Sequence, residues 1–326
     1  MSSFALNSNS PRDWRTRFDL TAFLTLSPDQ ASFDVRGFRA SSAVAREELE
    51  AVGKTFITGY NAAVRTDSLD GILRILADIP AQRRGFAAEG AAMGTAIIDA
   101  VPFRTPRLPQ LMVLLERDFT YLVHVGAGWA LARVPWRKRH ILSPLNPLYR
   151  WLAFDGLGFH DCYFKASHVL DNWRREQFGY AARAYDQGVG RALWFAGGGS
   201  ATWSADRIRG LAAERQGDLF SGLGLAMAYA GPTTTEDVRH ALELAGRDAP
   251  HLAQGIAFAC EARARATFVP QATHTAAQAL GFEAPALAAL VREARESLSE
   301  QEGEARYEAW RRVVSNAMAQ SRGGRE

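Results

Sequence analysis

FDGLGFHDCYF, residues 154–164, recurs in this chain as FSGLGLAMAYA, residues 220–230, with Phe, Gly, Leu, Gly and Tyr at the same offsets. GVGRALWF (188–195) and GAGWALAR (126–133) have the same Gly-x-Gly opening, and GKTFITGY (53–60) is a looser copy. The leading glycines of the copies are Gly53, Gly85, Gly126, Gly156, Gly188, Gly222 and Gly255. Most of them follow one another at intervals of 30 to 34 residues, which indicates a repeated structural unit.

The spacing of the copies predicts a helix-turn-helix unit, because it accommodates two helices of roughly three turns and two short connections. The third and seventh positions after the leading glycine carry large side chains, and positions four apart share a helix face. These side chains are Phe56, Trp129, Phe159, Leu225 and Phe258 at the third position and Tyr60, Tyr163, Phe195 and Tyr229 at the seventh. We therefore predict an all-α helical-repeat protein, a tetratricopeptide-like α-solenoid of about seven helix-turn-helix units. The alternative is that a chain with 28 glycines and abundant alanine produces such matches by chance.

The two ends of the chain differ from its body in composition. The first part carries Ser, Asn and Pro without clear periodicity, and the end is polar and rich in Gly and Arg. We predict a partly irregular N-terminal extension over residues 1–42, the helical-repeat domain over 43–315 and a flexible tail over 316–326.

Composition and charge exclude several classes of function. Hydrophobic residues make up 47% of the chain, and the formal net charge of +3 gives no overall attraction to nucleic acid, so we expect no nucleic-acid partner. Two cysteines, Cys162 and Cys260, cannot build a disulfide framework. No stretch has the order of a signal peptide, and no apolar run reaches the ~18 residues of a membrane span. These features predict a cytoplasmic protein.

The sequence lacks the common motifs for metals, cofactors and nucleophiles. It contains no HExxH, CxxC or Gly-x-Ser-x-Gly motif. The triple glycine of GGGSATWS (197–204) lacks the lysine of a phosphate-binding loop, and GAGWALA lacks the third glycine of a dinucleotide fingerprint. We therefore predict neither a metal site nor a cofactor.

His160 and Asp161 distinguish the first copy from the second, which has Ala226 and Met227 at these positions. Histidine exchanges protons near neutral pH, and a neighbouring carboxylate can orient it. Polar side chains at positions that are apolar in other copies are expected where stacked helices line a pocket. The candidate acid-base residues are therefore His160, Asp161, His124, Asp186 and Arg191. The alternative is that these side chains satisfy carbonyl groups and helix ends inside a packed core.

The aromatic side chains of the copies are suited to holding an extended apolar ligand between helices. The candidate ligand-binding residues are Trp129, Phe159, Tyr163, Trp194, Phe195 and Tyr229. Burying a polyene of about fifteen carbons at ~0.8 kcal/mol per carbon would contribute on the order of 10 kcal/mol before ordering losses. The alternative is that these aromatic residues are simply the core of the helical stack.

Several motifs, taken in order along the chain, resemble a known family. The motifs are LEAVGKTFITGYNAA (49–63), HVGAGWALARVPWR (124–137), FDGLGFHDCYF (154–164), YDQGVGRALWF (185–195), DLFSGLGLAMAYAG (218–231) and YEAWRR (307–312). From about residue 36 to residue 312, the chain is similar to the UnbL-type enediyne biosynthesis proteins. The resemblance implies a gene beside an iterative enediyne polyketide synthase, with an integral-membrane UnbU-type protein and an UnbV-type protein as companions. It also implies a part in converting a linear polyene into the enediyne core.

Two functions therefore compete. In the first, the helices bind a hydrophobic polyene or polyketide intermediate, and the acid-base residues assist a cofactor-free proton transfer, isomerisation or cyclisation. In the second, a non-catalytic adaptor docks a membrane-associated maturation complex through the stretch from Trp129 to Trp151, which is rich in Arg and Trp and contains no Asp or Glu. An enzyme or carrier should have an internal apolar cavity with His160 or Arg191 on its wall. An adaptor should have a filled core and carry its unusual residues on its outer face.

Overall fold

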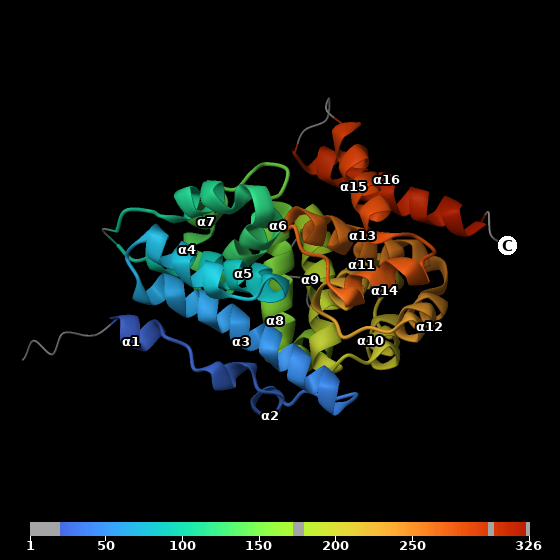
Figure 1. The fold of residues 1–326 in the computed structure, drawn as a ribbon, viewed down its shortest axis with the longest axis horizontal. Helices are drawn as coiled ribbons and strands as arrows, with labels where there is room; N and C mark the ends of the chain where they lie inside the picture. Colours follow the sequence, from blue (N-terminus) through green and yellow to red (C-terminus); the bar gives the residue numbers. More distant parts are fainter. Residues whose placement is uncertain (1–19, 103, 172–178, 299–302, 324–326) are drawn as a thin grey trace, which may run out of the picture.

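The computed structural model describes residues 20–102, 104–171, 179–298 and 303–323. Within these ranges helices are the only regular secondary structure, which confirms the all-α prediction (Figure 1). Of the expected N-terminal extension, residues 1–19 lie outside the described ranges. The rest of it contains two short α-helices and a 3-10 helix, namely α1 (Leu20–Leu24), η1 (Pro28–Ala31) and α2 (Phe33–Arg36).

Seven long helices make up most of the described chain between residues 43 and 265. They are α3 (Ala43–Arg65), α5 (Ala81–Asp99), α6 (Leu108–Arg133), α8 (Trp151–Asp171), α9 (Tyr180–Ala196), α11 (Ala213–Ala230) and α13 (Ala249–Arg265). Each packs against the next in chain order, so that α3 lies beside α5 and α8 lies between α6 and α9 (Figure 1). Every leading glycine of the predicted copies falls inside one of these helices.

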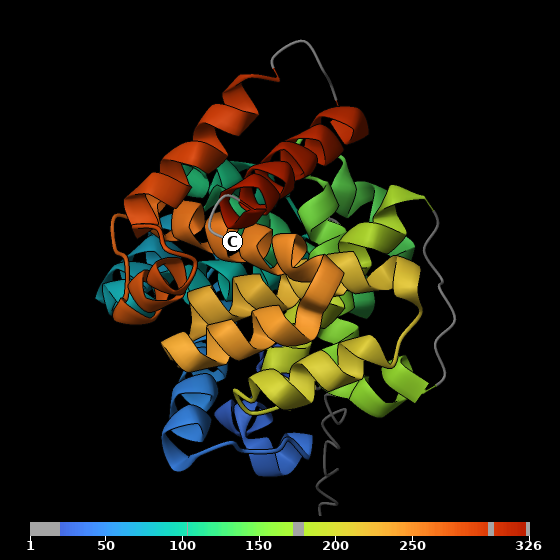
Figure 2. The same cartoon turned by 90° about the vertical axis from the view of Figure 1, so that its right-hand side faces the viewer.

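Shorter helices follow several of the long ones. They are α4 (Leu69–Asp78), η2 (Pro135–Arg137), α7 (Lys138–Leu142), α10 (Ala201–Arg209), α12 (Thr235–Ala245), η3 (Gly246–Asp248) and α14 (Gln271–Ala279). α10, α12 and α14 pack in a row on one side of the molecule (Figure 2). The local sequence sets where such a helix begins. In α12, the Thr234 hydroxyl accepts from the Asp237 N–H at 3.1 Å, and the Asp237 carboxylate accepts from the Thr234 N–H at 2.9 Å.

The C-terminal helices α15 (Ala284–Glu296) and α16 (Gly303–Gly323) pack against each other and against α13 (Figure 1). The domain end expected at residue 315 lies inside α16, so the expected tail begins within a helix. The physical reason is a buried face that continues past residue 315. It consists of Tyr307, Trp310, Val314 and Met318, which are spaced three or four residues apart and at most 3% exposed.

The Gly-x-Gly copies are explained by how closely the long helices pack. A Cβ atom at Gly156 would overlap the carbonyl oxygen of Val125 on α6, whereas one at Gly158 would overlap that of Tyr185 on α9. The same alternation recurs in the neighbouring helices, with Gly188 against Asp155, Gly190 against Leu219, Gly222 against Gln187 and Gly224 against Leu252. In these pairs the first glycine meets the preceding helix and the second meets the following one. A side chain at either position would push the helices apart.

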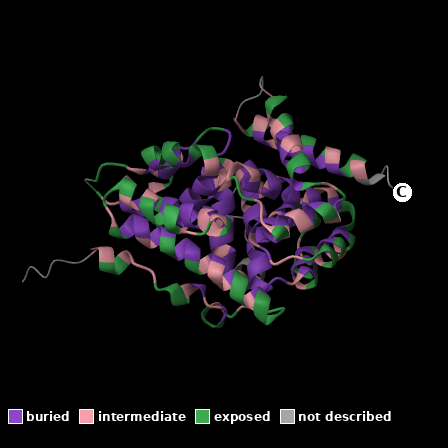
Figure 3. Ribbon diagram, viewed as in Figure 1, coloured by how far each residue is buried: buried purple, intermediate pink, exposed green. Residues whose placement is uncertain are grey.

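The series of long helices curls so that its end returns to its beginning. Arg263, near the end of α13, donates a hydrogen bond of 2.6 Å to the carbonyl of Gln82 in the first turn of α5. The rings of Phe86 on α5 and Tyr229 on α11 meet edge to face at 5.2 Å. Buried residues are concentrated where the helices face one another (Figure 3). Helices that are far apart in sequence therefore enclose one interior.

Candidate functional site

An apolar cavity lies inside the curled series of helices. Its wall comes from α3, α5, α6, α8, α9, α11 and the segment around η1, and includes Phe56, Trp129, Phe159 and Leu225. The space that atoms leave free, mouth included, is about 740 Å³. The centre of a water-sized sphere fits in only about 70 Å³ of it. This cavity, hereafter the slot, is therefore narrow and mostly walled by hydrophobic side chains.

A second apolar cavity adjoins the slot. It is lined by side chains such as Tyr121 of α6, Phe258 of α13 and Trp310 of α16, and its free space is about 590 Å³. Arg191, Leu225 and Tyr229 line both cavities, which therefore meet at these three side chains.

A buried charged cluster sits where the cavities meet. Arg191 on α9 donates a hydrogen bond through Nη1 to Oδ1 of Asp155 on α8, and its Nη2 lies 3.7 Å from Oε1 of Glu89 on α5. The Arg191 guanidinium also lies over the ring of Phe159, 4.9 Å from its centroid. Glu89 Oε1 accepts a hydrogen bond of 3.0 Å from the indole N–H of Trp129. The three charged side chains are at most 8% exposed, so three helices place buried charge where two largely apolar cavities meet.

The cluster contains two carboxylates, those of Glu89 and Asp155, but only one guanidinium, that of Arg191. Burial raises the pKa of Glu89 to about 7, the Asp155 carboxylate adds to this effect, and Arg191 opposes it. Burial also raises the pKa of Asp155, opposed by its contact with Arg191. A buried carboxylate without a cation of its own is costly in the charged form, so the cluster binds a proton near neutral pH.

The phenol of Tyr229 adds a polar group at the junction of the two cavities. Its hydroxyl is buried and has no hydrogen-bond partner among the described residues. The guanidinium of Arg263 stacks on its ring at 3.7 Å from the centroid, and burial raises the pKa of the phenol. Tyr229 therefore has a hydroxyl group that is not used by the described part of the fold.

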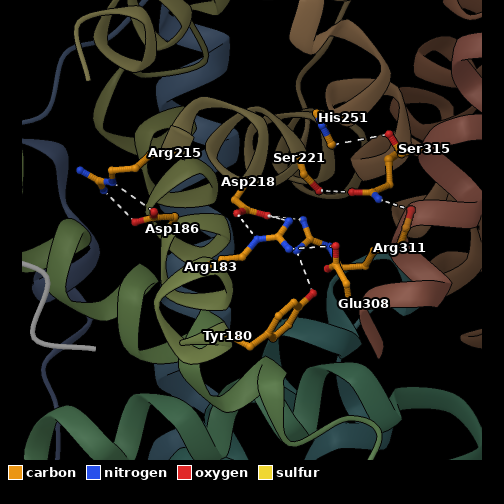
Figure 4. A network of polar contacts seen from close by, with 11 residues as sticks. Tyr180, Arg183, Asp186, Arg215, Asp218, Ser221, His251, Glu308, Arg311 and Ser315 are labelled. Atoms are coloured by element: carbon orange, nitrogen blue, oxygen red, sulfur yellow. Dashed lines mark hydrogen bonds and ion pairs between the residues drawn. The ribbon is translucent and has the colours of Figure 1, made fainter. Parts of the chain in front are cut away.

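A buried polar network fixes α16 over the second cavity (Figure 4). Arg311 of α16 binds Asp218 of α11 at 2.9 Å and donates to the hydroxyl of Tyr180 on α9 at 3.1 Å. Arg183 of α9 bridges Asp218 at 2.9 Å and Glu308 at 2.8 Å. α16 is thus attached to the long helices by paired charges as well as by its apolar face.

One known protein family matches nearly the whole of this chain. A family model described as "Protein of unknown function (DUF1702)" matches residues 19–318, from the start of α1 into α16. This chain belongs to the DUF1702 family. No curated protein and no solved structure gives a significant match.

In this DUF1702 protein, His160 and Asp161 lie beside the slot but not among its lining residues. His160 Nδ1 is 3.2 Å from Asp161 Oδ1, and the hydroxyl of Tyr185 donates to Asp161 Oδ2 at 2.9 Å. The imidazole packs against Trp129 and Phe164, with ring centroids 5.6 and 4.7 Å away. Burial lowers the pKa of His160, and Asp161 opposes this shift. Trp129 thus contacts both the histidine and the cluster.

His124 and Asp186 of the DUF1702 protein are engaged elsewhere. His124 donates through Nδ1 to the carbonyl of Thr120 at 2.7 Å and accepts through Nε2 from the Asn146 N–H at 3.2 Å. Burial lowers the pKa of His124 to about 4, which keeps it neutral. Asp186 binds Arg215 through both oxygens, at 2.7 and 3.1 Å (Figure 4). The structure therefore does not bring the five predicted acid-base residues together, and of these only Arg191 lines the cavities.

The predicted ligand-binding aromatic residues lie closer together. Those that line the slot are Trp129, Phe159, Tyr163, Phe195 and Tyr229. Trp194 does not line either cavity; it is fully buried and donates to the carbonyl of Gly231 at 2.9 Å. The third and seventh positions of the copies thus face the interior, as Phe159 and Tyr163 show.

Glu89 was not among the residues predicted from the sequence, although the sequence contains a signal for it. Glu89 is the fourth residue after Gly85. The same position in the other long helices holds Ile57, Ala130, His160, Ala192, Ala226 and Ala259. A comparison at this position would have selected Glu89 together with His160 as the polar exceptions.

Two features are absent from the described residues. No three of their His, Cys, Asp and Glu side chains are placed to hold a metal ion. None of their helices contains an apolar stretch long enough to cross a membrane.

Proposed function

We propose that this chain binds an extended, mainly apolar molecule in the slot, and that this molecule is a polyene intermediate of enediyne-type polyketide maturation. The observation that carries the proposal is the slot itself, whose largely hydrophobic wall includes the charged side chains of Glu89 and Arg191. An adaptor would be expected to have a filled core, whereas a carrier or enzyme needs an internal cavity with a polar group on its wall. Arg191 provides that group.

The shape and chemistry of the slot fit a flat, thin ligand. Conjugation keeps a polyene planar, and aromatic side chains such as Trp129 and Phe159 can pack against its faces. Removing about fifteen carbons from water contributes on the order of 10 kcal/mol before ordering losses. Enclosure between helices also keeps water away from a reactive chain. The polar cluster would contact the ligand at one point along its length, where a cofactor-free proton transfer, isomerisation or cyclisation can occur.

We also propose that this DUF1702 protein is of the UnbL type. The motifs that resemble UnbL-type proteins lie inside the range matched by the DUF1702 model. The leading glycines of the sequence copies fall in successive long helices, which supports descent from a helical repeat of about seven units. We further propose a cytoplasmic protein whose membrane association, through an UnbU-type protein with an UnbV-type protein, is indirect.

The natural ligand can be tested by co-expression with an enediyne-type polyketide synthase. We expect the purified chain to retain a compound with polyene absorption in the ultraviolet-visible spectrum. Ala226→Phe should lose that compound, because Ala226 lines the slot and the added ring fills it. Ala213→Phe is the matched control, since Ala213 is exposed on the same helix. Wild-type protein that carries no such compound, or equal loading of the two variants, would argue against the proposal.

The adaptor function has one specific observation in its favour. Trp136 is 76% exposed and precedes Arg137, Lys138 and Arg139 in a stretch without acidic residues. Exposed tryptophan beside basic residues is typical of docking surfaces. Trp129, by contrast, lines the slot and is unavailable to such a surface.

Charge reversal tests the adaptor function. Replacing Arg137, Lys138 and Arg139 with Glu should abolish co-purification with UnbU-type and UnbV-type proteins while polyene loading persists. Reversal of Arg207 and Arg209, which are exposed on α10, is the control. Unchanged co-purification of the triple variant would exclude this surface as the docking site.

A further inference from the structure

We propose that Glu89 exchanges a proton with the molecule bound in the slot and so moves a double bond along it. This inference rests on the proposed function, because it requires a ligand in the slot. Glu89 lines the slot, and its Oε1 is engaged by Trp129 at 3.0 Å and faces Arg191 at 3.7 Å. Both of these contacts are made to Oε1 and not to Oε2. One carboxylate oxygen is therefore fixed by the protein, and the other is left for the ligand.

Two neighbouring groups are less suited to this task. Asp155 is held by Arg191 through a direct hydrogen bond, and it lines the second cavity rather than the slot. His160 does not line the slot, and its Nδ1 faces Asp161. Of these three groups, only Glu89 lines the slot. Its position alone therefore makes it the candidate, whatever its pKa.

The surroundings of Glu89 allow both of its protonation states at neutral pH. Its charged and titratable neighbours are Arg191 from α9, Asp155 from α8 and Tyr229 from α11, while α3 and α6 present the rings of Phe56 and Trp129. Burial and Asp155 raise the pKa of Glu89 to about 7, against the opposing effect of Arg191. A carboxyl group with such a pKa can act as base and then as acid within one reaction cycle.

The chemistry needs no oxidant, reductant or cofactor. Oε2 removes a proton from a carbon next to a conjugated carbonyl chain, and the electron pair of the C–H bond moves through the chain to the carbonyl oxygen. Arg191 and Tyr229 are available near the charge that develops on that oxygen. Protonated Glu89 then returns the proton to a different carbon of the same chain. Atoms and electrons balance, and the product is a double-bond isomer. The ligand class is an unsaturated carbonyl compound with an extended apolar chain.

Deuterium exchange into pseudoionone, a conjugated ketone with an apolar tail, tests the step. We expect the wild-type protein in D₂O to accelerate deuterium uptake at the carbons attached to the far end of the conjugated system, as measured by mass spectrometry. Glu89→Gln keeps the shape of the side chain and the acceptor for Trp129 but cannot take up the proton. It should lower the rate at least about 100-fold. The wild-type rate should rise with pH through about 7 and then level off, because the base form of Glu89 is required.

The control and a separate binding measurement distinguish the possible failures. Glu261→Gln makes the same change in a buried carboxylate on α13 that is paired with Arg292 at 2.9 Å and lines neither cavity; its exchange rate should equal the wild-type rate. Binding of cis-parinaric acid, a fluorescent conjugated fatty acid, is measured for all three proteins. No binding to the wild-type protein would overturn the proposed function. Binding without exchange above the buffer rate, or equal exchange by Glu89→Gln, would overturn the role of Glu89 and leave ligand binding intact.

Discussion

At the scale of single residues, the polar cluster is the feature that separates this interior from an ordinary core. Arg191 was recognisable in the sequence because the same position of other copies holds Phe159 or Leu225. His124 and Asp186 stood out by the same argument, yet their side chains are engaged by Asn146 and Arg215. Periodicity shows which positions face inward. It does not show which polar partner lies across from them, because that partner is on another helix.

The raised pKa of Glu89 predicts a dependence of stability on pH. The pKa is about 7 in the folded chain and has an ordinary value of 4.5, so the folded state binds the proton more tightly. The stabilising contribution is complete below the ordinary value and is lost as the pH rises through about 7. The pKa difference corresponds to about 3 kcal/mol.

Urea unfolding of wild type and Glu89→Gln at about pH 5 and about pH 8 measures this contribution. The wild-type protein should lose more free energy of unfolding than the variant over this interval. Glu304→Gln, at an exposed position of α16, should behave as wild type. Equal pH dependence in Glu89→Gln and wild type would show that Glu89 does not titrate in this range.

At the scale of elements, the glycine pairs position the long helices, and the sequence contained this information. The interval between copies located the long helices, because each copy occupies one of them. The boundaries between each long helix and the shorter helices beside it could not be predicted from the sequence. It also did not locate the end of α16, since the buried face formed by Tyr307, Trp310 and Met318 lies beyond the last recognised copy.

Gly158→Ala tests the packing of α8 against α9. Its Cβ would overlap the carbonyl oxygen of Tyr185, so the two helices must separate. We expect a loss of about 1–3 kcal/mol of unfolding free energy, measured by denaturant titration. Gly210→Ala is the control, because Gly210 has a helical φ of −73° and its Cβ would come no closer than 3.5 Å to another group. If both substitutions lower the free energy of unfolding by the same amount, close approach of the helices is not the reason for glycine at position 158.

Arg311→Met tests the attachment of α16. The substitution leaves Asp218 with Arg183 alone and removes the donor to Tyr180. Loss of one partner from a buried ion pair should lower the free energy of opening α16 by about 3 kcal/mol. Hydrogen exchange followed by mass spectrometry should then show faster exchange across 303–323, whereas Arg312→Met, at an exposed neighbouring position, should not change it. Unchanged exchange in Arg311→Met would mean that apolar packing alone holds α16.

At the scale of the whole molecule, the interior is closed by the curl that returns α13 to α5. Contacts such as that between Arg263 and Gln82 join residues far apart in sequence, and no local pattern predicts them. The aromatic positions of the copies could be identified from spacing. Their convergence on one slot could not, because it depends on the rotation between successive helices. The slot is thus a property of the assembled series of helices, and the proposed function requires that it holds a ligand.

Fluorescence titration of the purified chain with cis-parinaric acid measures whether the slot holds a ligand. The probe is weakly fluorescent in water and brightens in an apolar site, so a saturable rise reports occupation of the slot. We predict saturation at one probe per chain for wild type and for Ala213→Phe, and none for Ala226→Phe, whose added ring occupies the slot. Circular dichroism would establish that all three proteins are folded. Equal saturation of Ala226→Phe and wild type, or no saturation of wild type, would show that the slot is not a ligand-binding site.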